Sequence, residues 1–246
     1  MPEIVVEGIS KTLGGLLTLG EISLTAVEQE FIGILGPSGC GKSTLFNIIS
    51  GLILPDAGRV IIDGKDFTGV TGRVSYMHQK DLLLPSCSIL DNTSIPLVLK
   101  GAPKRKARAV AAKYFEQFGL AGFEDYYPSQ LSGGMRQRAA LLRTYLFSSD
   151  IMLLDEPFAS LDAITKRKMQ VWLLGVFKEL HPTVLFITHD VDEALFLCDR
   201  VYVLSECPSK VCLEVNVPFC RPKSSRTITD PRYGKLRDEI LEALSI

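Results

Sequence analysis

Two short segments of the sequence combine glycines with residues that can bind phosphate. The first, GPSGCGKS, runs from Gly36 to Ser43, and the second, LSGGMRQR, runs from Leu131 to Arg138. Glycines let the backbone N–H groups of a loop approach an anion closely, and the N-terminus of a following helix favours negative charge. The first segment also matches G-x-x-x-x-G-K-[ST], the pattern of a loop that cradles nucleotide phosphates. The second segment offers the same chemistry without the lysine of that pattern.

The first segment stands between a predicted strand and a predicted helix, where a phosphate-binding loop (P-loop) belongs. The apolar run FIGIL ends directly before it, and STLFNIISGL follows Lys42. Lys42 can reach the terminal phosphate oxygens, and the Ser43 hydroxyl can ligate Mg²⁺. We predict that the loop binds a nucleoside triphosphate; a glycine-rich turn without a ligand is the alternative. The predicted phosphate-binding residues are Gly36, Pro37, Ser38, Gly39, Cys40, Gly41, Lys42, Ser43 and Thr44.

Cys40 lies inside this loop, close to the N-terminus of the predicted helix. The positive end of a helix stabilises a thiolate, so we expect the pKa of this thiol to be lowered. A maleimide should then react at Cys40 and block nucleotide binding. The alternative is that cysteine is simply a small residue that fits a tight loop.

Two carboxylates end a second apolar run. The residues IMLL predict a buried strand, and Asp155 and Glu156 follow it directly. In α/β proteins, side chains at the carboxyl ends of parallel strands face the ligand. We assign Asp155 to holding Mg²⁺ through water, and Glu156 to polarising the water that attacks the γ-phosphate. Two acids that merely cap a helix are the alternative.

Two further polar residues follow predicted strands. Gln79 comes after RVSYM, and His189 comes after TVLFIT. The uncharged Gln79 amide can contact the metal or the attacking water, and the His189 imidazole can hydrogen-bond the γ-phosphate. A structural role is the alternative for each residue taken singly, but their position at strand ends favours a role in the site.

Composition excludes several classes of protein. The net charge of −1 gives no basic field for nucleic acid, and the apolar runs are far shorter than the roughly 20 residues that span a bilayer. The first ten residues do not resemble a signal peptide, and the six cysteines lack the spacing of a zinc site. We expect a cytosolic chain with reduced thiols.

Strand and helix patterns alternate along the chain and predict an α/β fold with a parallel sheet, of the P-loop NTPase type. The alternating segments EIVVEGI and EISLTAV predict an antiparallel edge at the N-terminus, and no convincing strand occurs in 81–147. We expect one domain over 1–246, with an α/β core of 1–80 and 148–220. A helical subdomain of 81–147 interrupts this core, and 221–246 forms a helical tail. Helices are expected from Lys42, Ile89, Pro103, Gly133, Asp162 and Val191, and in KLRDEILEAL.

Six motifs together resemble those of ABC transporter ATP-binding subunits in order and spacing, over almost the whole chain. They are GPSGCGKS, Gln79, LSGGMRQR, IMLLDEP, SLD at 160–162 and the His189 of ITHD. Within that family, the chain looks most like the subunits of importers for nitrate, sulfonates, taurine and thiamine-pyrimidine precursors. QKDLLLP, LSGGMRQRAALLRT, DEPFASLDAITK and ITHDVDEALFLCDRV carry this second likeness.

The resemblance implies that the two phosphate-binding segments are halves of one shared ATP site. Ser132, Gly133 and Gly134 would contact the γ-phosphate held by the P-loop of a second subunit, head to tail, with Asp162 at the dimer seam. ATP would close this homodimer, and hydrolysis would reopen it. The segment KDLLLPSCSI and the helical insert would receive a coupling helix of a membrane permease. The protein would then lie at the cytoplasmic face of the membrane, coupled indirectly to an extracytoplasmic solute-binding protein and to no nucleic acid.

One position departs from the family pattern. Family members usually place an aromatic ring near the N-terminus to stack on adenine, whereas the aligned residue here is Leu13, and no aromatic residue precedes Phe31. Leucine contacts a base without aromatic stacking, which is worth on the order of 1 kcal/mol. We expect weak nucleotide affinity and poor selection of adenine over guanine.

Three other functions are open to a chain with these motifs. A soluble ABC ATPase of translation or DNA repair usually has two cassettes or a long coiled coil, and neither is present. A nucleotide-binding scaffold without hydrolysis conflicts with the intact Lys42, Asp155, Glu156 and His189. A P-loop kinase or GTPase leaves LSGG unexplained, and no NKxD-type guanine-reading motif occurs.

Overall fold

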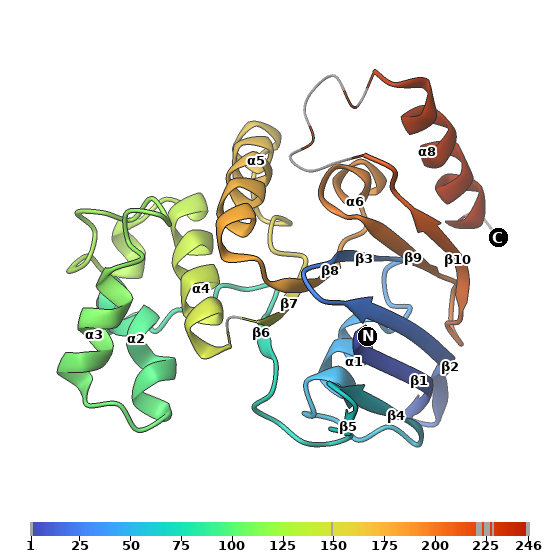
Figure 1. Ribbon diagram of the computed structural model, residues 1–246, viewed down its shortest axis with the longest axis horizontal. Coiled ribbons are helices and arrows are strands. Elements are labelled where there is room, and N and C mark those ends of the chain that lie inside the picture. Colours follow the sequence, from blue (N-terminus) through green and yellow to red (C-terminus); the bar gives the residue numbers. More distant parts are fainter. Residues whose placement is uncertain (1, 149, 220–222, 224–226, 228, 245–246) are drawn as a thin grey trace. The chain divides into compact units, whose positions relative to one another are not determined.

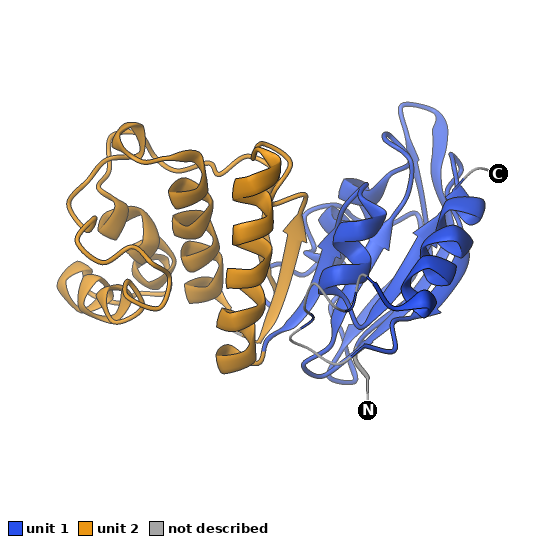
Figure 2. Ribbon diagram, turned by 90° about the horizontal axis from the view of Figure 1, so that it is seen from above, with its two compact units in different colours: residues 1–73, 182–246 blue, residues 74–181 orange. Residues whose placement is uncertain are grey.

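The computed structural model describes residues 2–148, 150–219, 223, 227 and 229–244, and it divides into two compact units (Figure 2). Unit 1 comprises Met1–Arg73 and Pro182–Ile246, and unit 2 comprises Val74–His181. No helix in the described part of the chain is both long and apolar enough to cross a membrane.

The N-terminal strands of unit 1 form an antiparallel sheet. It contains β1 (Pro2–Leu13), β2 (Leu16–Val27), β4 (Ala57–Ile62) and β5 (Lys65–Asp66), in the order β2-β1-β4-β5. Buried and exposed residues alternate along the second half of β2, because only one of its faces covers the core. The predicted antiparallel edge is therefore confirmed, although β5 was not predicted.

The remaining strands of unit 1 form a mostly parallel sheet. Its order is β10 (Val211–Asn216), β9 (Arg200–Leu204), β3 (Phe31–Leu35) and β8 (Thr183–Ile187). Strand β3 runs parallel to β8 and β9, whereas β10 is antiparallel to β9. Every residue of β3 and β8 is buried, as expected of strands covered on both faces. The predicted parallel core is therefore observed in this unit.

Three helices of unit 1 lie within the described residues. Helix α1 (Lys42–Ile49) follows the P-loop, and α6 (Val191–Leu197) follows His189. Helix α8 (Pro231–Leu244), red in Figure 1, contacts α6, β9 and β10. It contains the predicted helical segment KLRDEILEAL, but most of 220–228 in the expected tail lies outside the described residues.

Unit 2 combines two strands with a helical region. Strands β6 (Ser75–Met77) and β7 (Ile151–Asp155) pair in parallel. The helices are α2 (Ile89–Leu99), α3 (Lys104–Ala112), α4 (Gly133–Phe147) and α5 (Ala163–Leu180), with a short 3₁₀ helix at Pro128–Gln130. The segment 81–147, which is described throughout, contains helices and turns and no strand, as predicted. The compact unit is larger than this helical segment because it includes β6, β7 and α5.

Asn92 organises the segment that leads into α2. Its side chain is fully buried, and its Nδ2 donates to the carbonyl oxygens of Leu84, Cys87 and Ser88 at 3.0–3.1 Å. Its Oδ1 accepts from the backbone N–H of Leu84 at 2.7 Å. The two N–H donors of this amide are thus shared among three carbonyl groups, and its oxygen satisfies the Leu84 N–H, so one side chain ties together both sides of the turn.

Replacing Asn92 with alanine should destabilise the protein by about 3 kcal/mol, because buried backbone groups lose their partners. Urea unfolding of the chain measures this loss. Thr93→Val is the matched control, since it removes one neighbouring bond, from the Thr93 hydroxyl to the Leu90 carbonyl, and should cost about 1 kcal/mol or less. Equal losses for the two variants would contradict the organising role of Asn92.

Candidate nucleotide-binding site

The P-loop of unit 1 has a backbone that only glycine adopts easily. Strand β3 ends at Leu35, and the loop then reaches positive φ at Gly39 (82°) and Gly41 (103°). A Cβ atom at Gly41 would lie 2.8 Å from Leu19 Cδ2, so strand β2 leaves no room for a side chain there. Gly41 is also the N-cap of α1 and has no side chain with which to cap it. The first N–H groups of α1 are therefore suited to an anion.

Lys42 places its charge at this loop. The side chain is buried, and its ammonium group donates to the carbonyl oxygens of Gly36 at 2.8 Å and Pro37 at 2.7 Å. The third N–H donor of the ammonium group faces Cys40 Sγ at 3.9 Å, a long contact that a phosphate oxygen could replace. Ser43, the predicted metal ligand, is exposed on the first turn of α1.

The expectation of a lowered pKa for Cys40 is wrong. The side chain is only 2% exposed, and burial raises the pKa of its thiol above the ordinary value; the nearby Lys42 charge opposes this only in part. The accessible thiol at the loop is Cys207, whose Sγ lies 3.5 Å from the Gly39 carbonyl oxygen. No local pattern predicts this contact, because 168 positions separate the two residues.

His189 lies at the same sheet edge as the P-loop. Strands β3 and β8 are parallel, with Ile34 opposite Ile187, so their carboxyl ends are neighbours. The backbone N–H of Thr188 donates to the Ile34 carbonyl oxygen at 3.3 Å, and His189 follows as an exposed residue. Unit 1 thus brings the P-loop and His189 together at one edge; the role of the imidazole stays a prediction.

Unit 2 brings Gln79, Asp155 and Glu156 together at an equivalent edge. Strands β6 and β7 are parallel, and Gln79 Nε2 donates to Glu156 Oε2 at 3.3 Å. Glu156 has a φ of 44°, in the left-handed region, where a non-glycine residue is strained. Such strain is found where the surrounding structure fixes a functional side chain.

Tyr76 is a residue of this edge that sequence reasoning missed. Its hydroxyl donates to Asp155 Oδ2 at 3.2 Å, and Asp155 is only 6% exposed. Burial raises the pKa of the Tyr76 hydroxyl, and the Asp155 charge raises it further. Tyr76 therefore stays a neutral donor that fixes the orientation of the carboxylate. Its place three residues before Gln79 on a predicted strand was the available signal.

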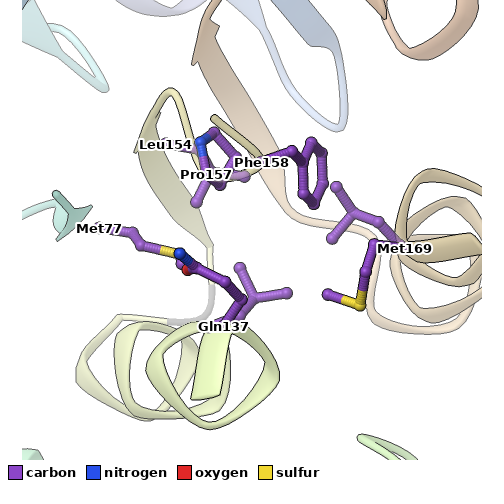
Figure 3. A pocket seen from close by; sticks show the side chains of 8 residues that line it. Met77, Gln137, Leu154, Pro157, Phe158 and Met169 are labelled. Carbon is purple, nitrogen blue, oxygen red and sulfur yellow. The ribbon is translucent and has the colours of Figure 1, made fainter. Parts of the chain in front are cut away.

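A small apolar pocket in unit 2 supports the segment after Glu156 (Figure 3). Its lining comes from β6, β7, α4, α5 and the turn after β7, and comprises Met77, Gln137, Leu141, Leu154, Pro157, Phe158, Met169 and Leu173. The cavity volume of about 10 Å³ suits one water molecule and no larger ligand. Gln137 Oε1 is buried and has no hydrogen-bond partner among the described residues.

The LSGG segment and Asp162 form helix N-termini in unit 2. The Ser132 hydroxyl caps α4 by accepting from the Met135 N–H at 3.3 Å. A Cβ atom at Gly134 would lie 3.3 Å from Thr165 Cγ2, so α5 constrains this position to a small residue. Asp162 caps α5 by accepting from Ile164 and Thr165, and the bonds from Thr165 and then Ile164 lower the pKa of its carboxyl. These caps shape exposed helix ends; their role toward a second subunit stays a prediction.

Leu13 is the last residue of β1. It is 41% exposed and pairs across the β1–β2 hairpin with the exposed Leu16. The structure thus presents an aliphatic surface at the position where the family pattern has an aromatic ring.

Comparison with known proteins gives one consistent result. The family described as "ABC transporter" matches residues 19–159. The formylaminopyrimidine import ATP-binding protein ThiZ of Halalkalibacterium halodurans is 47% identical over 80% of this chain and 77% of its own length. The nitrate import ATP-binding protein NrtD of Synechococcus elongatus is 41% identical over 94% of this chain and 86% of its own.

A solved structure is similar in fold as well as in sequence. It is a dimer of the ATP-binding cassette MJ0796 in a post-hydrolysis state, bound to ADP and phosphate. The TM-score is 0.75 and the identity 29%, and the match covers 88% of this chain and 100% of that one.

A maleimide should modify Cys207 before Cys40 and should weaken nucleotide binding, because the added group would lie against Gly39 of the P-loop. Cys207→Ser should protect binding, whereas Cys40→Ser should not. Mass spectrometry of the labelled chain and fluorescent-nucleotide titration measure both effects. Labelling that begins at Cys40 would contradict this assignment.

Leu13→Tyr should tighten ATP binding about fivefold, because a ring at this exposed position supplies about 1 kcal/mol of stacking. Titration with ATP and with GTP measures the change, and selection of adenine should improve in parallel. Leu99→Tyr, at an exposed position of α2 in unit 2, is the control and should leave the dissociation constant unaltered. If Leu13→Tyr leaves the dissociation constant for ATP unchanged, position 13 does not contact the adenine base.

Proposed function

The chain belongs to the ABC transporter family, and we propose that it is the ATP-hydrolysing subunit of an importer for a small solute of the nitrate, sulfonate, taurine or pyrimidine-precursor type. The observation that carries hydrolysis is the contact between Gln79 and Glu156 at the carboxyl ends of β6 and β7. It places an acid suited to general-base catalysis beside an amide that can orient water. The names of the similar import proteins support the class of solute.

In this proposal, unit 1 binds the triphosphate. The N–H groups of the P-loop and of the first turn of α1 hold the phosphates, and Lys42 adds its charge. The His189 imidazole, at the same sheet edge, hydrogen-bonds the γ-phosphate. The exposed aliphatic surface at Leu13 receives the base.

Each unit also offers oxygen donors of the kind that Mg²⁺ prefers. In unit 1 this donor is the Ser43 hydroxyl; in unit 2 it is the Gln79 amide, together with the Asp155 carboxylate, which would act through water. Bound Mg²⁺ would neutralise charge that develops on the phosphate oxygens. Tyr76 keeps the Asp155 carboxylate oriented through its hydrogen bond.

Unit 2 performs the hydrolytic step. Glu156 accepts a proton from the water as that water attacks the γ-phosphate, and Gln79 helps to orient the same water molecule. The strained backbone of Glu156 fixes where its carboxylate points. Phosphoryl transfer depends mostly on such positioning and on charge stabilisation.

The site is completed by a second copy of the chain, head to tail. Ser132, Gly133 and Gly134 contact the γ-phosphate of the partner, and Asp162 lies at the seam. The likeness to a dimeric cassette supports this arrangement. So do the positions of the LSGG and Asp162 segments at helix N-termini, where N–H groups favour anions.

The permease is proposed to dock on unit 2. Leu82 and Leu84, in the segment after Gln79, are 54% and 46% exposed, and Leu82 has a φ of 46°. Exposed apolar residues of this kind favour a protein interface. The chain would then act at the cytoplasmic face of the membrane, with the extracytoplasmic solute-binding protein as an indirect partner.

ATP hydrolysis by the purified chain should rise faster than linearly with protein concentration, because two copies build each site. Glu156→Gln should lower kcat by about 100-fold or more while ATP binding is retained, since only the base is removed. Steady-state phosphate release and size exclusion with ATP measure the two effects.

Glu116→Gln is the control variant for this experiment. Glu116 is an exposed residue of unit 2 outside the site, so its substitution should leave the rate unchanged. A rate that is linear in concentration and insensitive to Glu156→Gln would contradict the shared catalytic site.

A further inference from the structure

Helix α6 carries the segment that directly follows His189, yet it has only seven residues. A helix of this length is not stable on its own in water, so tertiary contacts must fix its position. Contacts that fix the position of α6 therefore also fix the neighbouring turn that contains His189.

The turn and α6 are bonded to each other. The Asp190 side chain caps α6 by accepting from the Glu193 N–H at 3.1 Å. The Thr188 hydroxyl accepts from the Asp190 N–H at 3.1 Å and donates to the buried carboxylate of Glu193. A displacement of α6 would therefore be transmitted to residues on both sides of His189.

The first turn of α6 is held by helix α8. The Tyr233 hydroxyl lies 3.2 Å from the backbone carbonyl oxygen of Asp192 and 3.3 Å from its Oδ1. Arg237 Nε lies 3.3 Å from the same carboxylate oxygen. Tyr233 is almost fully buried, so its hydroxyl is desolvated and gains most from these partners.

The last turn of α6 is held by Lys223. Its ammonium group is buried and donates to the carbonyl oxygens of Leu195, at 2.9 Å, and Cys198. These carbonyl groups lie at the negative end of the helix, which a cation stabilises. A buried ammonium group is costly unless its donors are satisfied, so this geometry is specific.

We propose that Lys223, Tyr233 and Arg237, here named the α6 clamp, are positioning residues for His189. Residues in the C-terminal part of the chain bond to both ends of α6 and so determine the position of the His189 imidazole at the sheet edge. The inference rests on the proposed role of His189 at the γ-phosphate. The α6 clamp would then influence the rate of hydrolysis from the C-terminal part of the chain. It would act by positioning α6 and not by contacting the nucleotide.

The chain offers a direct spectroscopic test, because it has only three histidines. His78, which stacks on Tyr76, and His181 belong to unit 2 and serve as internal references. The ring resonances of ¹³C-labelled histidine are recorded for the full chain, for Tyr233→Phe and for Lys223→Met with Tyr233→Phe. The His189 resonance should shift in both variants, and more in the double one, whereas those of His78 and His181 should stay in place.

Hydrolysis is measured on the same proteins. The double variant should lose about three- to tenfold in kcat while the affinity for ADP, which has no γ-phosphate, is unchanged because the P-loop is intact. Lys235→Gln, an exposed substitution on the same helix, is the matched control and should change neither readout.

An unmoved His189 resonance overturns the proposal, and so does a common shift of all three histidines, which would report general loosening. A shifted His189 with unaltered kcat overturns it as well. If the unmodified chain fails to hydrolyse ATP while His189 still shifts alone, the proposed catalytic function fails and the structural coupling stands. The single variant Tyr233→Phe removes only a hydroxyl group, so the test survives if the double variant does not fold.

Discussion

The parallel pairing of largely buried strands is the constraint on which the rest of the structure depends. Strands β3 and β8 pair in parallel in unit 1, and β6 and β7 do so in unit 2. The carboxyl ends of the two strands in each pair therefore lie at the same edge of the sheet. Apolar side chains fill most positions of these strands, whereas Gln79, Glu156 and His189 follow the strand ends. The residues proposed to act in catalysis stand at such edges, because side chains at the carboxyl ends of parallel strands face a ligand.

Fixing these polar residues requires support from outside the strands. Glu156 keeps a left-handed backbone, Asp155 is oriented by Tyr76, and the P-loop is pressed against β2 at Gly41. The turn at His189 is supported differently, through a short helix that depends on distant parts of the chain. Rigid support suits the residues proposed to bind phosphate and metal, whereas a helix held at its two ends can respond to a change elsewhere in the protein.

Much of the fold followed from local pattern. The apolar runs located the strands of the core, and the helix starts at Lys42, Ile89, Gly133 and Val191 agree with the structure. Glycine spacing located the P-loop, because few other residues adopt its backbone. The predicted direction of the Cys40 pKa shift is wrong for a clear reason. A position at a helix N-terminus lowers the pKa of a thiol, but burial, which cannot be read from a sequence, raises it by more.

The sequence by itself determined the chemistry of the site: its phosphate loop, its acids at strand ends and its family. Each of these features is recognised from short segments of consecutive residues, because residue type and spacing within a segment are sufficient to identify it. Only the tertiary structure decided what each residue touches. Tyr76 beside Asp155, Cys207 beside Gly39, and Tyr233 beside Asp192 are contacts between residues 41 to 168 positions apart. Such contacts arise when packing closes long loops, and no local pattern encodes that closure.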